Sequence, residues 1–199
     1  MTNNFEQIKS LLKFEDDYFY FIQIIQRKKE VLGVGGNNRI IRSYMVSSME
    51  KLDKNQEEII QLCEMFNARA YIHLNRRKWS RISLMCLKHT AELIANGQHD
   101  GVKSVLETVV GRNSCEPHGE KTWIVDIDGT DAPSPLMMAT IDYKCEPKAK
   151  DINEGKCIAI VPTKNGLHLI TKPFDRSEFH TKYPEVDVHT DNPTILYVP

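Results

Sequence analysis

The stretch Trp123–Asp128, WIVDID, constrains the fold more than any other segment. Three apolar residues lead into Asp126, one more intervenes, and Asp128 precedes Gly129. Side chains alternate across a strand with a period of two, so both aspartates are predicted to lie on one face near the strand's end. Neighbouring carboxylates repel each other. A cation between them is therefore expected.

The segments after this strand predict a strand-rich C-terminal third. Short apolar and β-branched runs alternate there with turn residues, which is the pattern of hairpin strands. One helix interrupts them, and Asp175 is its candidate N-cap. The predicted strands are CIAIVP, LHLIT, VDVH and TILYV, at residues 157–162, 167–171, 186–189 and 194–198.

The first half of the chain carries two helical patterns around one strand. Apolar residues at helical spacing predict helices over residues 48–66 and 78–96, and ARAYIHL at 68–74 predicts a strand. The predicted apolar face of the second helix consists of Ile82, Cys86, Leu87 and Ile94. The glycine-rich, polar segment from about 96 to 121 is predicted to be a loop or lid.

GVGGNN, at residues 33–38, separates two strand-like segments, KKEVL at 28–32 and RIIRSYMV at 39–46. Its glycines supply the positive φ angles that a hairpin tip requires, so a hairpin is predicted. A phosphate-binding loop is the alternative, but the full glycine fingerprint and a following helix are both lacking.

Together these patterns predict an α+β fold. We expect an RRM-like, mostly antiparallel sheet with helices on one face, joined to an N-terminal helix–strand–helix unit. Residues 1–66 are expected to form the N-terminal helices and hairpin, and residues 67–199 the α+β core that carries the site. The whole chain is expected to be one compact unit.

Composition is that of an ordinary globular protein. Of the 199 residues, 41% are hydrophobic and 27% are charged, and the formal net charge of −1 argues against a bulk polycation that coats nucleic acid. The five cysteines form no CxxC pair, which favours free thiols in a reducing compartment. No signal peptide or membrane-length apolar run is present. A cytoplasmic protein without membrane contact is expected.

The aspartate pair has two enzymatic interpretations. DIDGT, beginning at Asp126, resembles the first motif of haloacid dehalogenase-like phosphatases, in which the first aspartate is the nucleophile and the second the acid or base. That motif normally opens a doubly wound domain, whereas only 71 residues follow Asp128 here and they have the pattern of hairpin strands.

The second interpretation begins with PTKNGLHLITKPFD, residues 162–175. A KNG turn reverses the chain, and alternation places His168 on the face opposite its leucine neighbours. If this strand neighbours WIVDID, one face carries Asp126, Asp128 and His168. In EVDVH, Asp187 supplies a further carboxylate.

This order of DxD, GxH and apolar-Asp motifs resembles the catalytic core of archaeo-eukaryotic primases and primase-polymerases. The resemblance covers roughly residues 120–190 and is compatible with a phage or mobile-element protein. It implies a metal-dependent nucleotidyltransferase that uses nucleoside triphosphates and a nucleic-acid template, with any helicase on a separate chain. Asp126, Asp128 and Asp187 would hold two Mg²⁺ or Mn²⁺ ions, and His168, with Lys164 in the preceding turn, would contact the nucleotide.

Two departures from the family pattern involve the second and third motifs. Gly166 stands where the family usually has serine or another small residue, and Thr163 is the nearest hydroxyl. Asp191 is the alternative to Asp187 as third ligand, although it lies beside a proline turn. We favour Asp187, since a strand fixes its position more firmly.

Basic and aromatic residues are interleaved in ARAYIHLNRRKWSR, residues 68–81. Such a segment suits phosphates with bases stacked on rings, and Arg69, Arg76 and Arg77 are the candidate nucleotide-binding residues. A solvated helix start is the alternative.

Other readings of the same residues stay open. Asp128-Gly129 also suits a simple turn, with Asp126 paired to an arginine. A zinc site from Cys115, His118, Cys145 and Cys157 is not expected, because the spacing is irregular. A catalytically inactive nucleic-acid-binding or regulatory protein of similar fold is the alternative function.

Overall fold

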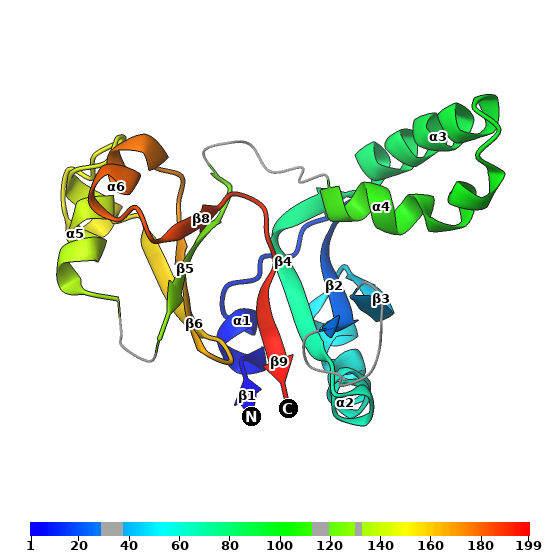
Figure 1. Cartoon of the computed structure of the whole chain (residues 1–199), viewed down its shortest axis with the longest axis horizontal. Helices are drawn as coiled ribbons and strands as arrows, with labels where there is room; N and C mark the ends of the chain where they lie inside the picture. The colour runs from blue at the N-terminus through cyan, green and yellow to red at the C-terminus, as the bar shows by residue number, and fades with distance from the viewer. Residues whose placement is uncertain (29–37, 113–119, 130–132) are drawn as a thin grey trace.

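The computed structural model describes residues 1–28, 38–112, 120–129 and 133–199. It confirms the α+β class, but the strands form two antiparallel sheets rather than one (Figure 1). The two sheets lie side by side, and each has its own helices. The division matters for the candidate site because residues from both sheets line one cavity of about 360 Å³.

The first sheet, sheet A, has the strand order β1-β9-β4-β2-β3. It joins strands from both ends of the chain, so residues before and after position 66 share one sheet. Two helices accompany it, α1 (Phe5–Lys9) and α2 (Met49–Phe66). The strands are β1 (Thr2–Asn3), β2 (Tyr18–Gln26), β3 (Arg39–Val46), β4 (Arg69–Lys78) and β9 (Thr194–Val198).

The second sheet, sheet B, has the strand order β6-β7-β5-β8. Helices α5 (Pro135–Tyr143) and α6 (Arg176–Lys182) lie on its outer side, away from sheet A (Figure 1). The predicted helix cap is confirmed, since Asp175 accepts hydrogen bonds from the first backbone amides of α6. The strands are β5 (Trp123–Asp128), β6 (Cys157–Pro162), β7 (Gly166–Thr171) and β8 (Asp187–His189).

Local sequence explains the boundaries of the best-predicted helix, α2. The Ser48 hydroxyl accepts a hydrogen bond from the Lys51 amide at 3.2 Å, and Asn67 adopts a left-handed conformation with φ of 44° at the other end. Leu52, Ile59 and Cys63 form its buried side.

Alternation in β5 divides its side chains between two apolar cores. Trp123 and Val125 pack with Phe174 and Phe179 beneath α5 and α6. Ile124, on the opposite face, joins the core that sheet A shares with sheet B. The face that carries Ile124 therefore looks toward sheet A, and Asp126 and Asp128 follow on that same face.

A helical arm projects from sheet A (Figure 1). It consists of α3 (Trp79–Ala95), the short 3-10 helix η2 (His99–Ser104) and α4 (Val105–Arg112), so the predicted loop is helical over much of its length. The predicted apolar face of α3 is only partly correct. Ile82 is fully buried, whereas Leu87 and Ile94 are 69% and 52% exposed, because the arm's outer side has no covering element among the described residues.

The hairpin is formed by β2 and β3, which pair antiparallel from Tyr20–Val46 to Gln26–Arg39, so β2 takes the place of the first strand expected at 28–32, of which residues 29–32 lie outside the described residues. Its tip, including the glycines of GVGGNN, lies outside the described residues. A further short 3-10 helix, η4 (Ile152–Glu154), precedes β6. None of the described helices combines the length and the apolar character that crossing a membrane requires.

Candidate functional site

Three predicted site residues form a row across adjacent strands of sheet B. Asp126 of β5 is directly opposite His168 of β7 on one side and Asp187 of β8 on the other. Residues directly opposite in antiparallel strands point to the same face, with Cβ atoms about 4.5–5.5 Å apart. The three strands are thus neighbours, which is the condition for the predicted face that carries Asp126, Asp128 and His168. Asp128 lies on the same face of β5, opposite Gly166.

Gly166 is fixed by the close approach of β7 to β5. A Cβ atom at this position would lie 2.1 Å from the Ile127 carbonyl oxygen, a distance that no side chain tolerates. The side chain at this position of the second motif can therefore be no larger than the hydrogen atom of glycine. A serine would not fit without moving the strand that carries Asp128.

His168 is held in a defined orientation. Its Nδ1 lies 2.9 Å from the Thr194 hydroxyl, and its Nε2 lies 3.5 Å from the Asp126 carboxylate. Burial lowers the pKa of His168 below its usual value, and His189 adds to this effect, while Asp126 opposes it. A neutral imidazole with one donor and one acceptor nitrogen satisfies both contacts.

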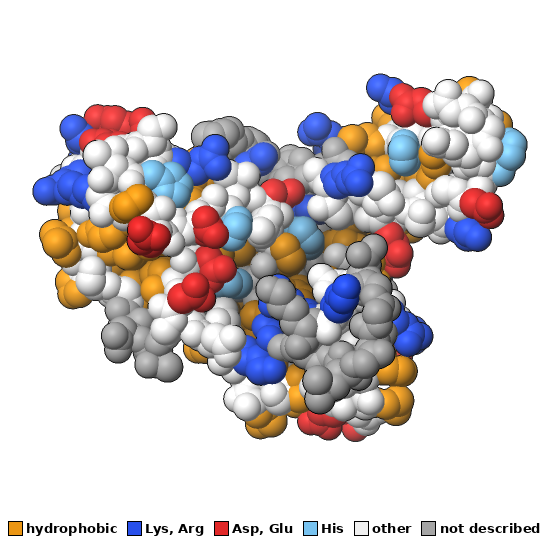
Figure 2. Space-filling view, in the orientation of Figure 1, with side chains coloured by type: hydrophobic (Ala, Val, Ile, Leu, Met, Phe, Trp, Pro, Cys, Tyr) orange, Lys and Arg blue, Asp and Glu red, His pale blue; other side chains and the backbone are white. Residues whose placement is uncertain are grey.

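A cavity of about 360 Å³ opens in front of this row. Asp126, Asp128 and His168 line its wall on sheet B, and Arg69 and Arg27 line its wall on sheet A. Figure 2 shows acidic and histidine side chains gathered over β5 and β8, with basic side chains toward sheet A. The cavity therefore offers carboxylates on one wall and guanidinium groups on the other.

The carboxylates have the donor chemistry that Mg²⁺ and Mn²⁺ prefer. The Asp126 side chain is 41% exposed, and Asp187 is exposed. Asp187 does not line the cavity, and no three acidic, histidine or cysteine side chains of the described residues already form a cation site. A metal ion would have to draw the three aspartates together from this arrangement.

Arg76 and Arg77 do not line this cavity, in contrast to the prediction. The Arg76 guanidinium pairs with Glu15 at 3.0 Å and lies 4.6 Å from the Tyr18 ring centroid. Arg77 is fully buried and pairs with Asp191. Successive residues of β4 alternate between faces, and local irregularities in its pairing add to the separation. Only Arg69 of the three predicted arginines faces the cavity.

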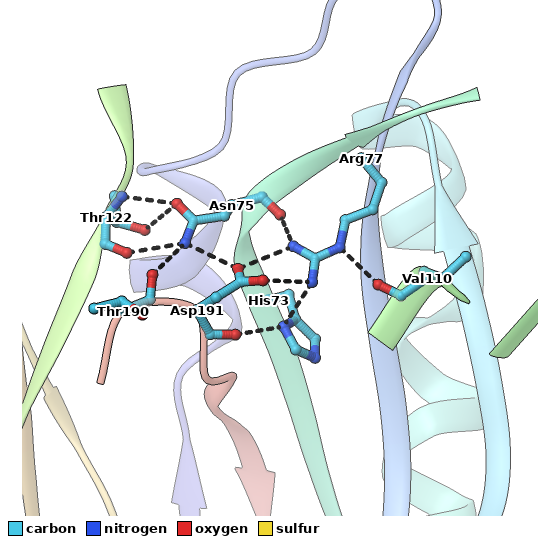
Figure 3. A network of polar contacts seen from close by, with 7 residues as sticks. All are labelled: His73, Asn75, Arg77, Val110, Thr122, Thr190 and Asp191. Atoms are coloured by element: carbon cyan, nitrogen blue, oxygen red, sulfur yellow. Dashed lines mark hydrogen bonds and ion pairs between the residues drawn. The ribbon is translucent and has the colours of Figure 1, made fainter. Parts of the chain in front are cut away.

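Arg77 is the centre of a polar network at the junction of the two sheets (Figure 3). Its Nη1 and Nη2 donate to the two Asp191 carboxylate oxygens at 3.3 and 3.2 Å, and its Nε donates to the Val110 carbonyl of α4 at 2.9 Å. A further donation reaches the Asn75 carbonyl. Asp191 is thus a structural partner of Arg77 rather than a free ligand.

Asn75 extends this network to the entry of β5. Its side-chain oxygen accepts from the Thr122 amide at 2.7 Å, and its amide group donates to the carbonyls of Thr122 and Thr190 (Figure 3). Thr122 immediately precedes β5, and Thr190 immediately follows β8. The network therefore fixes to sheet A the two strands that carry Asp126 and Asp187.

His73 belongs to the same network. Its Nδ1 lies 3.2 Å from Arg77 Nη2 and 3.1 Å from the Asp191 carbonyl oxygen (Figure 3). Burial, with Arg77 as a further cause, lowers the pKa of His73 to about 3. The imidazole is therefore neutral at physiological pH, and it tolerates the adjacent guanidinium.

Several cavity residues were missed in the sequence. Arg27 is isolated at the end of β2, and His189 follows the third motif at the next position on the same face of β8. The period-two pattern from Asp187 was the available signal for His189. Asn192 and Pro193, which also line the cavity, belong to a turn that carried no pattern.

Lys164 lies in the exposed turn between β6 and β7 and does not line the cavity. Of the candidate zinc ligands, Cys115 and His118 lie outside the described residues. Cys145 and Cys157 are free thiols, and burial raises the pKa of Cys157 to about 12.

Comparison with protein-family models, curated proteins and solved structures finds no match. Function is therefore argued from the chemistry and geometry of the site itself.

Proposed function

We propose that the protein is a metal-dependent nucleotidyltransferase of the primase-polymerase type, which uses nucleoside triphosphates. The row of His168, Asp126 and Asp187 across three adjacent strands carries this proposal. Asp128 adds a further carboxylate on the same face. A triphosphate in the cavity would meet carboxylates on one wall and Arg69 and Arg27 on the other.

The reaction joins a hydroxyl oxygen to the α-phosphorus of the triphosphate and releases pyrophosphate. Asp126, Asp128 and Asp187 would hold Mg²⁺ or Mn²⁺, which supplies charge neutralisation at the reacting phosphate when bound. Arg69 and Arg27 complement the remaining negative charge of the phosphates. His168, fixed by Thr194, presents its Nε2 beside Asp126 for a hydrogen bond to a phosphate oxygen.

The haloacid dehalogenase-like interpretation receives less support. In that family the strand with the first motif lies in a parallel, doubly wound sheet, whereas β5 pairs antiparallel with both of its neighbours. An aspartyl-phosphate intermediate on Asp126 is therefore not expected. A nucleic-acid template is the expected partner, and any helicase would be a separate chain.

A binding protein without catalysis is the second candidate. The exposure of Asp187, and its position outside the cavity, favour it. Such a protein would keep the fold and bind nucleic acid without responding to metal. Free thiols at four described cysteines suit a reducing compartment, so we expect either protein to act in the cytoplasm.

Thermal unfolding with Mn²⁺ and a non-hydrolysable nucleoside triphosphate tests the proposed function. Metal and triphosphate together should raise the melting temperature by more than the sum of their separate effects, because each binds partly through the other. Asp126→Asn should abolish this excess. Asp100→Asn, the same change at a fully exposed aspartate on the arm, should retain it. An additive response, or no response, in the wild-type protein would favour the binding protein.

A further inference from the structure

A second hollow, of about 920 Å³, lies on the outer side of sheet B. The segment after α5 and the segment between β7 and α6 form its walls, and Trp123 and Phe174 contribute its apolar floor. Exposed lysines stand around it, namely Lys148, Lys150 and Lys172. The hollow is separate from the proposed active site, which lies on the inner face and at the other end of β5.

A buried lysine holds one wall of this hollow in place. Lys156 is 3% exposed, and its Nζ donates to the carbonyls of Asp142, Cys145 and Pro147 at 3.2, 2.8 and 2.6 Å. The Asp142 carboxylate in turn accepts from the Lys156 amide at 2.6 Å. The three donors of Lys156 are therefore used within the protein. Lys156 thus stabilises this wall of the hollow, and the exposed positive charge of the hollow comes from the other lysines.

The acidic residues around the hollow are occupied by backbone amides. Glu146 accepts from the Lys148 amide at 3.1 Å, and Glu154 accepts from the Lys150 amide at 3.0 Å. Asp175 caps α6. Of the lysines, Lys148 also pairs with Glu146 at 3.3 Å, at an exposed site where such a pair is weak.

The ammonium groups of Lys150 and Lys172 make no hydrogen bond or ion pair within the described part of the chain. The ammonium groups of Lys150 and Lys172 are thus exposed to solvent in this hollow. The carboxylates keep their charge although they accept backbone hydrogen bonds, and the Glu146 side chain is 64% exposed. The exposed lysines without an intramolecular partner favour an anionic ligand.

Lys172 also belongs to a neighbouring hollow of about 530 Å³ at the junction of the sheets. Lys13 and Lys121 line that hollow together with two acidic residues, Glu15, which pairs with Arg76, and Glu120. The lysines therefore continue from one hollow into the next. We call the five residues the lysine track: Lys13, Lys121, Lys172, Lys148 and Lys150.

We propose that the lysine track binds the phosphate backbone of a single-stranded nucleic acid. A track across two adjoining hollows suits a polyanion better than one mononucleotide, because successive phosphates find successive cations. Trp123 and Phe174 are 7% and 4% exposed and pack against each other, so the track is expected to contact phosphates rather than to stack bases. This assignment replaces the arginine segment at 68–81 as the nucleic-acid surface, since Arg76 and Arg77 are engaged within the protein.

The inference rests on the proposed function only for the role of the bound nucleic acid, namely as template or primer. Lys172 follows β7 and is four residues beyond His168, which is about 13 Å along a strand. A nucleic-acid strand bound to the lysine track thus lies close enough to the cavity to continue toward it. Binding to the track itself requires neither metal nor catalysis.

Fluorescence anisotropy of a labelled oligothymidylate, in EDTA and at several salt concentrations, tests the lysine track. The triple variant Lys148→Ala, Lys150→Ala and Lys172→Ala should lose about three phosphate contacts. The slope of log affinity against log salt should then fall in magnitude by about 2, and affinity at 0.1 M salt should fall about 100-fold. The matched control replaces Lys54, Lys88 and Lys103, exposed lysines of α2 and the arm, by alanine. Its charge change is the same, and it should retain the wild-type slope.

Equal losses in the two triple variants would overturn the inference, as would full displacement of the oligonucleotide by equimolar mononucleotide. Retained binding in the track variant would also overturn it. Asp100→Asn, at a fully exposed position on the arm, should bind the oligonucleotide as the wild-type protein does. If nucleotide incorporation fails while the track variant loses binding, the track stands and the enzymatic proposal falls. If incorporation proceeds while the track variant binds the oligonucleotide normally, the enzymatic proposal stands and the lysine track falls. Unchanged thermal unfolding of both triple variants excludes misfolding.

Discussion

Replacing Asp191 by alanine tests whether the network around Arg77 holds the two sheets together. The substitution removes the carboxylate that accepts from both Arg77 terminal nitrogens, at 3.3 and 3.2 Å, and from Asn75 at 3.1 Å. Arg77 is fully buried, whereas the Asp191 side chain is 24% exposed. A buried guanidinium would remain without its counter-charge.

The expected cost follows from this burial. Removing one partner of a buried ion pair costs about 3–5 kcal/mol of the free energy of unfolding, mainly because the remaining charge is uncompensated. For a chain of 199 residues this corresponds to a fall in melting temperature of roughly 6–20 °C. Asp191→Asn should cost less, because its amide oxygen still accepts a hydrogen bond.

Urea unfolding of Asp191→Ala, Arg77→Met and the double variant measures this coupling. The double variant should be more stable than the sum of the single losses predicts, since removing both charges leaves none uncompensated. A loss below 1 kcal/mol for Asp191→Ala, or strictly additive losses, would refute the view that this pair joins the sheets.

Three further predictions concern single positions. His73→Gln should make the free energy of unfolding less dependent on pH on the acid side, as measured by urea unfolding at pH 4–7. The pKa of His73 is about 3 in the folded protein and about 6.5 in the unfolded chain. The stability that the neutral imidazole contributes is therefore complete above pH 6.5 and falls by about 1.4 kcal/mol per pH unit as the pH drops toward 3. Gly166→Ala should lower the free energy of unfolding by about 1–3 kcal/mol, because the added Cβ atom would lie 2.1 Å from the Ile127 carbonyl oxygen. Gly111→Ala has open space around it and should not destabilise the protein. Equal melting temperatures of the two variants would contradict this. Ser48→Ala should cost about 1 kcal/mol by removing the α2 cap, and an unchanged melting temperature would exclude that role.

Local pattern was sufficient to predict the strands around the site. Period-two alternation placed Asp126 and Asp128 on one face, because side-chain direction is encoded within a few residues. The adjacency of WIVDID, GLHLIT and EVDVH was a condition of the family resemblance, and the structure meets it although none of these pairs is a hairpin. The α+β class followed from the same patterns.

The features that sequence did not predict depend on distant partners. The sequence predicted Arg77 as an exposed, nucleotide-binding cation. It is buried instead, because Asp191, 114 positions later, supplies its counter-charge. The division into two sheets likewise depends on β9 returning to pair with β4. Leu87 and Ile94 fit a helical apolar face but are exposed, because hydrophobic spacing does not reveal whether another element covers that face.

Incorporation of a labelled nucleotide into a primed oligonucleotide tests the enzymatic proposal most directly. With Mn²⁺ or Mg²⁺ and all four nucleoside triphosphates, the wild-type protein should extend a DNA or RNA primer, and EDTA should stop the reaction. Asp126→Asn should abolish extension without lowering the melting temperature, since it removes one of several neighbouring carboxylates, while Asp100→Asn should extend as the wild-type protein does. Extension by Asp126→Asn at the wild-type rate, or no extension by the wild-type protein on either template, would contradict the proposed function.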